Sequence, residues 1–176
     1  ADALSIDDVA YAALNPSRRS KILVVTAFQG GAPANQALVI AMKTSAIERL
    51  ATIDYADTAI LRDPQHQQLA AGGTYDLIIY DQVQPTEMPQ ANTLFFGRAP
   101  PAGGWSLTPV TDDRAPVIID TDKLHPLTRL LNLNNVVILN SGIVVAPQGA
   151  TELITGRSEG RRVGEECRSR WSPYHY

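Results

Sequence analysis

The sequence has only one thiol and no long apolar run. Its 176 residues include a single cysteine, Cys167, which excludes an internal disulfide and a zinc site built from thiolates. No apolar run reaches the roughly 20 residues that a membrane-spanning helix needs. The chain also begins without an initiator Met or a basic-then-apolar leader. We therefore expect it to be an internal piece of a longer protein.

An excess of positive charge is absent as well. Lys and Arg number 15 against 18 Asp and Glu, which gives a net charge of −3. Because several Arg gather near the C-terminus, the rest of the chain is more acidic than this value. An acidic body has no electrostatic attraction for nucleic acid or an anionic membrane, so we expect neither as a partner of this chain. The hydrophobic content of 44% is typical of a globular protein.

The two ends differ from the body. Residues 1–14 show short alternating stretches that predict the last strand of a preceding β domain, followed by a linker over 15–20. Residues 156–176 have clustered Arg and no period of 2 or 3.6. Their string RSEGRRVGEECRSRWSPYHY resembles translated cloning or adapter sequence; the alternative is a genuine basic arm. We expect this tail to be unstructured and to pack on nothing, Trp171 included.

The body, residues 21–155, predicts an α/β domain. Continuous apolar runs within 22–26, 75–81 and 93–96 are typical of strands buried on both faces, so we expect them in parallel at the centre of one sheet. The alternation of strands and helices over 21–97 favours a doubly wound, mostly parallel sheet. The other expected elements are a weaker strand at 50–56, helices at 35–47, 63–71 and 125–131, short strands at 105–109 and 116–120, and a hairpin formed by 136–139 and 143–145.

Several constellations are candidate sites. The Gly-containing segment Thr26–Asn35 joins a strand to a helix and offers a phosphate cradle, but it lacks the P-loop Lys, so a plain turn is favoured. The densest set of oxygen and nitrogen ligands comprises Asp112, Asp113, Asp120, Asp122 and His125. Ca²⁺ or Mg²⁺ would suit these carboxylates. The alternative is that Asp122 and His125 cap a helix and that the Asp pair forms a turn. We predict no metal site and no cofactor.

The sequence offers only weak evidence for a catalytic site. Ser141, His125 and Asp120 would make a hydrolase triad, but Ser141 lies in N-S-G rather than G-x-S-x-G, and a hairpin turn explains it. His66 lies in a polar segment and is expected to be solvated. The aromatic residues are expected to be core or half-buried side chains; they are Tyr75, Tyr80, Phe95, Phe96 and Trp105. We predict no catalytic residue.

A distributed set of motifs over about residues 1–155 resembles one family. The motifs are KILVVT, YDLIIYD, the P-x-x-x-P loop at Pro85 and Pro89, LFFGRAPP, D-x-D-x-x-HPL at 120–127, and NNVVILNSGIVVAPQGATELI. They are similar to the C-terminal region of bacterial membrane proteins with a BatA-type membrane segment and a von Willebrand factor A domain. The resemblance implies a class I glutamine amidotransferase-like, flavodoxin-type fold, cut short after Ile154, in a protein that is membrane-anchored as a whole.

The resemblance does not bring amidotransferase chemistry with it. That reaction needs a Cys on a tight strand–helix turn, and the turns after Val25, Asp81 and Phe96 carry none. The leading hypothesis is a non-catalytic scaffold or interaction domain that contacts protein partners or neighbouring domains of the longer chain. The alternative is a hydrolase or amidotransferase relative that uses the Asp120–His125 region, which requires those side chains to converge in a cleft.

Overall fold

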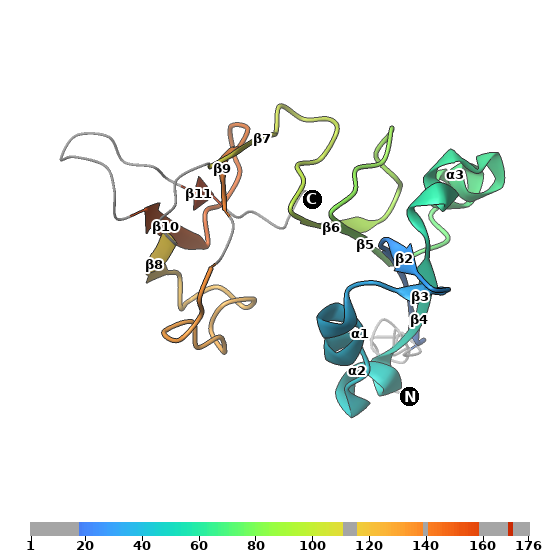
Figure 1. Cartoon of the computed structure of the whole chain (residues 1–176), viewed down its shortest axis with the longest axis horizontal. Coiled ribbons are helices and arrows are strands. Elements are labelled where there is room, and N and C mark those ends of the chain that lie inside the picture. The colour runs from blue at the N-terminus through green and yellow to red at the C-terminus, as the bar shows by residue number, and fades with distance from the viewer. Residues whose placement is uncertain (1–17, 111–115, 139–140, 159–168, 171–176) are drawn as a thin grey trace, which may run out of the picture.

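A four-stranded parallel sheet lies toward the right of the molecule in Figure 1. The computed structural model describes residues 18–110, 116–138, 141–158 and 169–170. The sheet runs in the order β4-β1-β5-β6, and every adjacent pair is parallel. Its strands are β1 (Ser20–Val25), β4 (Ala51–Ala56), β5 (Leu77–Asp81) and β6 (Asn92–Phe96). The parallel pairing predicted for the apolar runs is confirmed, but β6 lies at the edge of this sheet and not at its centre.

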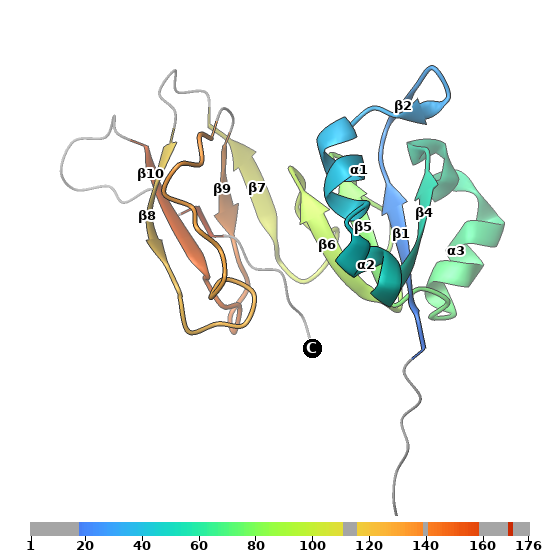
Figure 2. The same cartoon turned by 90° about the horizontal axis from the view of Figure 1, so that it is seen from below.

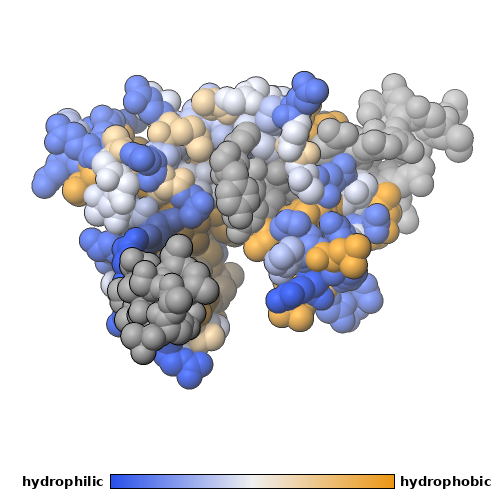
Figure 3. Space-filling view, turned by 180° about the vertical axis from the view of Figure 1, so that it is seen from behind, coloured by the Kyte–Doolittle hydropathy of each residue, from blue (hydrophilic) through white to orange (hydrophobic). Residues whose placement is uncertain are grey.

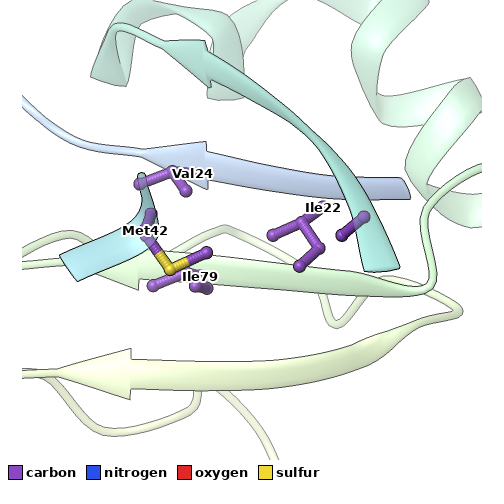
Figure 4. Packing of buried hydrophobic residues seen from close by; sticks show 5 residues of the cluster. Ile22, Val24, Met42 and Ile79 are labelled. Carbon is purple, nitrogen blue, oxygen red and sulfur yellow. The ribbon is translucent and has the colours of Figure 1, made fainter. Parts of the chain in front are cut away.

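Both faces of the sheet are covered, which explains the continuous apolar runs. Successive side chains of a strand point to opposite faces. Ile22 and Val24 therefore pack with Ile79 on the face covered by helices α1 (Gln36–Met42) and α2 (Ser45–Leu50). On this face Met42 lies against Val24 and Ile79 (Figure 4). Leu23 belongs to the core on the other face, under helix α3 (Pro64–Ala71). Figure 2 shows these helices on opposite sides of the sheet.

The helix predicted over 35–47 is divided into α1 (Gln36–Met42) and α2 (Ser45–Leu50). Asn35 begins α1, and its side-chain oxygen accepts a hydrogen bond from Leu38 N at 3.1 Å. Thr44 has an extended conformation that interrupts the helical backbone. The second helix begins after Thr44, whose side chain makes no capping hydrogen bond, and the single helix is not formed.

The helix predicted over 63–71 is confirmed as α3 (Pro64–Ala71). Asp63 caps it by accepting a hydrogen bond from Gln65 N at 3.0 Å, Pro64 occupies the first turn, and Gly72 ends the helix. A short 3₁₀ helix, η1 (Thr58–Arg62), precedes it.

The later strands form antiparallel sheets that gather beyond β6, at the left of Figure 2. The predicted strands at 105–109 and 116–120 are confirmed as β7 (Ser106–Pro109) and β8 (Pro116–Thr121). The predicted hairpin is wrong, because β9 (Gly142–Val145) pairs with β7, and Val136–Ile138 form no strand. Gly142 is the first residue of β9, and a Cβ there would collide with the Leu107 side chain and approach the Thr108 carbonyl oxygen. Close packing against β7, rather than a turn, explains this glycine.

The predicted helix over 125–131 is also wrong. Arg129 N donates to His125 O at 2.9 Å, but Leu131 N then donates to Thr128 O, three residues back, and the segment forms turns. The Thr128 hydroxyl donates to Asp122 O. A hydroxyl that bonds nearby carbonyls competes with the helical ladder, and so short a helix has little stability of its own.

The predictions for the ends need correction where the structure describes them. Ser20, expected in the linker, is the first residue of β1. Strand β10 (Ile154–Ser158) pairs with β8, and β11 (Ser169–Arg170) pairs with β10, so these parts of the tail lie in a sheet. Gly156 is buried at an irregularity of the β8–β10 register, and glycine is common at such bulges. Residues 1–17, 159–168 and 171–176, with Trp171, lie outside the described residues.

Among the residues that the structure describes, no helix has the length and apolar character needed to cross a membrane.

Candidate functional site

The carboxyl edge of the parallel sheet is the first candidate site. The chain passes from β1 to β4 on one side and then returns to β5 on the other side of β1. Ligands of open α/β sheets bind at such a switch point, outside the carboxyl ends of the strands. The segments that follow β1 and β5, residues 26–35 and 82–91, therefore meet where a ligand site is expected.

Asp81 organises this edge. Its buried carboxylate Oδ2 accepts hydrogen bonds from Thr26 Oγ1 at 2.7 Å and from Asn35 Nδ2 at 2.9 Å. Asn35 also caps α1, so one carboxylate joins the end of β5, the end of β1 and the start of a helix. No sequence motif indicates this network; the available signal is that Asp81 ends an apolar strand, where a buried acid needs partners.

The segment predicted to be a plain turn contains a small hairpin made of β2 (Phe28–Gln29) and β3 (Ala32–Pro33). Gly30 and Gly31 form its tip with φ of 61° and 83°, a region that favours glycine. Asp57 accepts hydrogen bonds from Ala59 N and Phe28 N at 2.9 and 3.0 Å. These bonds, led by the one from Ala59, hold the pKa of Asp57 below its ordinary value.

The segments that follow β5 and β6 also pack closely against each other. Gln82 has a φ of 59°, and its backbone N donates to Phe96 O at 2.9 Å. Gly97 has a φ of 68°, and a Cβ there would collide with the side-chain amide of Gln82. The positive φ favours glycine at position 97, whereas the Gln82 amide is the end of a flexible side chain and can move.

The prediction that His66 is solvated is wrong. It lies in α3 and is 4% exposed rather than solvated. Its helix turns it toward the sheet, together with Ala70 one turn later, and its ring lies 6.2 Å from that of Tyr75. Nδ1 has no hydrogen-bond partner within the described part of the chain. The polar neighbours along the sequence concealed this burial; the spacing of His66 from Ala70 was the available signal.

Burial lowers the pKa of His66, and the charge of Asp63 opposes the shift. The unfolded chain therefore binds a proton more readily than the folded one, so stability is complete above the ordinary His pKa of about 6.5 and is lost as the pH falls toward the folded value. We expect His66→Gln to reduce this acid-induced loss of unfolding free energy, measured by urea denaturation between pH 7.5 and 5. His125→Gln is the control. Equal pH slopes for His66→Gln and wild type would contradict the prediction.

A pocket of about 170 Å³ lies beside His66. It is lined by α3, by the buried Tyr80 and by the segment from Pro85 to Pro89. Burial raises the pKa of Tyr80 to about 12, so its phenol stays neutral at physiological pH. The P-x-x-x-P loop noted in the sequence is therefore one wall of this pocket.

The Asp120–His125 region is occupied with local contacts. Asp120 Oδ1 accepts from Thr121 N, Asp122 Oδ1 from Leu124 N, and His125 Nδ1 from Leu127 N, at 2.8, 2.8 and 3.3 Å. These bonds are typical of turn and capping side chains. No group of three or more His, Cys, Asp or Glu suited to hold a metal occurs in the described ranges. Asp112 and Asp113 lie outside those ranges.

The triad of Ser141, His125 and Asp120 is not assembled by any hydrogen bond in the described part of the structure. The backbone oxygen of Ser141 accepts from Val110 N at 3.0 Å, which places Ser141 at the start of the β7–β9 pair. The aromatic prediction is confirmed, because Tyr80 is buried and the other four are half-buried. Tyr80 and Phe95 stack with ring centroids 4.9 Å apart.

The fold defines an α/β protein whose four-stranded parallel sheet is flanked by helices and accompanied by small antiparallel sheets. No family model, no curated protein and no solved structure matches the chain.

Proposed function

We propose that this chain is a non-catalytic scaffold or protein-interaction domain. The observation that carries the proposal is a set of exposed large hydrophobic side chains between positions 116 and 145. Leu124 and Leu130 are 93% and 86% exposed. Burying a leucine side chain on association contributes roughly 1.5–3 kcal/mol, so such a surface favours a protein partner.

Nine of the 13 large hydrophobic side chains that are exposed in the described residues lie between positions 116 and 145. We define the apolar surface as the large hydrophobic residues exposed between positions 116 and 145: Val117, Ile119, Leu124, Leu127, Leu130, Leu131, Val136, Val137 and Val145. Orange patches appear on this part of the molecule at the right of Figure 3. Val117 and Ile119 are alternate residues of β8 and share one face of that strand. Large exposed apolar patches mark interaction sites.

The proposal also includes the family of proteins to which the chain belongs. The resemblance to bacterial BatA and von Willebrand factor A domain proteins implies a class I glutamine amidotransferase-like domain in a membrane-anchored chain. The parallel order β4-β1-β5-β6, with helices on both faces, supports that fold. In this setting the apolar surface contacts a protein partner or a neighbouring domain of the longer chain.

The catalytic alternative has less support. It needs His125 and at least two carboxylates to converge in a cleft, whereas Asp120 and Asp122 are exposed and each bonds its neighbouring backbone. A panel of ester, amide and phosphoester substrates tests it. Turnover that is lost in a folded His125→Ala variant would overturn the scaffold proposal.

Site-specific photocrosslinking tests the apolar surface directly. We expect a photoreactive residue at position 124 to capture a protein, or a neighbouring domain of the same chain, in cells that produce the full protein. Position 50 is the matched control, since Leu50 is 69% exposed but lies on α2. Equal capture from both positions would contradict the proposal.

The captured protein or domain is then purified for a binding measurement. We expect Leu124→Glu with Leu130→Glu to weaken its affinity by about tenfold or more, because both changes place charge in an apolar contact. Leu50→Glu should leave the affinity unchanged. Unchanged binding by the double variant would also contradict the proposal.

A further inference from the structure

Strand β4 ends the parallel sheet on the side away from β6 (Figure 2). It pairs with β1 over six consecutive residues without a bulge, and no other described strand pairs with it. Proteins commonly protect an edge strand with proline, lysine or a bulge. β4 contains none of these, and its only charged residue is Asp54. An open, regular edge offers its backbone groups to a further strand.

The backbone groups on the open side of β4 follow from the alternation of a strand in its ladder. Ala56 O accepts a hydrogen bond from Thr26 N at 3.1 Å, so the backbone of Ala56 faces β1. Residues at odd distances from Ala56 in the strand present their N–H and C=O groups to the opposite side. The N–H and C=O groups of Ile53 and Tyr55 therefore point to the side where the described residues provide no strand.

Charge sets how β4 can pair with a second copy of itself. Two such strands pair antiparallel about a two-fold axis at one residue, because side chains that face each other must lie on the same face of the sheet. An axis at Asp54 places the two Asp54 carboxylates directly opposite each other, which is destabilising. An axis at Ile53 places Asp54 opposite Thr52, whose hydroxyl is a hydrogen-bond donor. Charge therefore selects Ile53 as the centre.

The residues that flank the strand match the same axis. Arg49 and Asp57 are equally far from Ile53 along the chain, so the axis brings Arg49 of each copy to the end of the strand where Asp57 of the other copy lies. Arg49 is exposed and forms no ion pair within the described residues. Leu50, which is 69% exposed, comes opposite Ala56. Opposite charges and apolar side chains thus meet at both ends of the contact.

The core on one face of the sheet also continues across this axis. Ile53 and Tyr55 are half-buried and pack against the cluster under α1 and α2, next to the buried Ile22 and Val24. The same two side chains of a second copy would cover part of their remaining exposed area, and burial of apolar area favours association.

We propose that two copies of this chain associate through β4, antiparallel about a two-fold axis at Ile53, and join their two four-stranded sheets into one sheet of eight strands. Ile53 N–H of each copy then donates to Ile53 C=O of the other copy, and Tyr55 N–H donates to Ala51 C=O of the other copy. This contact is separate from the apolar surface between positions 116 and 145, so it holds or fails independently of the proposed function.

Sedimentation equilibrium of the whole chain between about 1 µM and 1 mM tests the association. We expect the mass to rise from 19.1 kDa toward twice that value. Thr52→Lys places a positive charge opposite Asp54 in two equivalent pairs and should tighten the dimer by about 2- to 30-fold, whereas Thr52→Asp should weaken it by a similar factor. Thr86→Lys and Thr86→Asp make the same changes at an exposed threonine outside β4 and should have no effect.

Amide hydrogen exchange locates the contact. A higher protein concentration should slow exchange at Ile53 and Tyr55, whose N–H groups point outward, and leave Thr52 and Asp54 unchanged, because their N–H groups face β1 in both states. A photoreactive residue at position 50 should crosslink two copies of this chain, which mass spectrometry distinguishes from the protein or domain captured at position 124.

Four results would overturn the proposal. They are a chain that stays monomeric at about 1 mM, a dimer with equal affinity in Thr52→Lys and Thr52→Asp, a dimer that forms without slower exchange at Ile53 and Tyr55, and a dimer that Leu124→Glu abolishes but changes at position 52 do not alter. The last result would place self-association on the apolar surface. Thr52→Lys keeps the test valid if Thr52→Asp does not fold.

Discussion

Replacing Ile78 by alanine is expected to lower the free energy of unfolding by about 3–5 kcal/mol. Ile78 is 0% exposed in β5, next to the central β1, and packs in the core that includes Leu23, Val25 and Tyr80. The substitution removes buried methyl groups and leaves a cavity that strands held in a parallel ladder cannot fill by moving. Urea denaturation followed by circular dichroism measures the change.

Ile119→Ala is the matched control, with the same chemical change in β8, where the side chain is 58% exposed. We expect its free energy of unfolding to differ from that of the wild type by no more than about 0.5 kcal/mol. Similar losses for the two variants would mean that the parallel sheet is not the stabilising core of the chain.

Replacing Asp81 by alanine is expected to lower the free energy of unfolding by about 2–4 kcal/mol. The change leaves the buried Thr26 hydroxyl and the Asn35 amide without their acceptor. Hydrogen bonds to a charged group contribute roughly 1.5–3 kcal/mol, and an unpaired buried donor adds its own desolvation penalty. Because Asn35 caps α1, we also expect faster amide hydrogen exchange in that helix.

A double-mutant cycle with Thr26→Val isolates the pairwise interaction. The two substitutions should be non-additive by about 1–2 kcal/mol, since both remove the same hydrogen bond. Asp54→Ala removes an exposed carboxylate from β4 and should change stability by no more than about 0.5 kcal/mol. Additive effects of Asp81→Ala and Thr26→Val would contradict the network.

Some features of the candidate sites follow from local sequence patterns, and others depend on contacts between distant segments. Local patterns identified the Gly30–Gly31 turn and the proline loop at Pro85 and Pro89, because turn-forming residues act on their own backbone. They did not identify the hairpin of β2 and β3 around that turn. They did not identify Asp81 as the acceptor for Thr26, since these residues meet only when β5 pairs with β1. His66 was misjudged for a related reason: its polar sequence neighbours do not face the sheet.

The sequence by itself determined the parallel strands and α3. Apolar runs such as Ile22–Val25 must be buried on both faces, and Asp63, Pro64 and Gly72 carry the start and end of the helix in their own chemistry. Only the tertiary structure decided the partner of β9, the pairing of Gly156 in β10 and the burial of His66. Strand pairing and burial depend on contacts between residues far apart in the chain, and no local period records which distant segment will supply them.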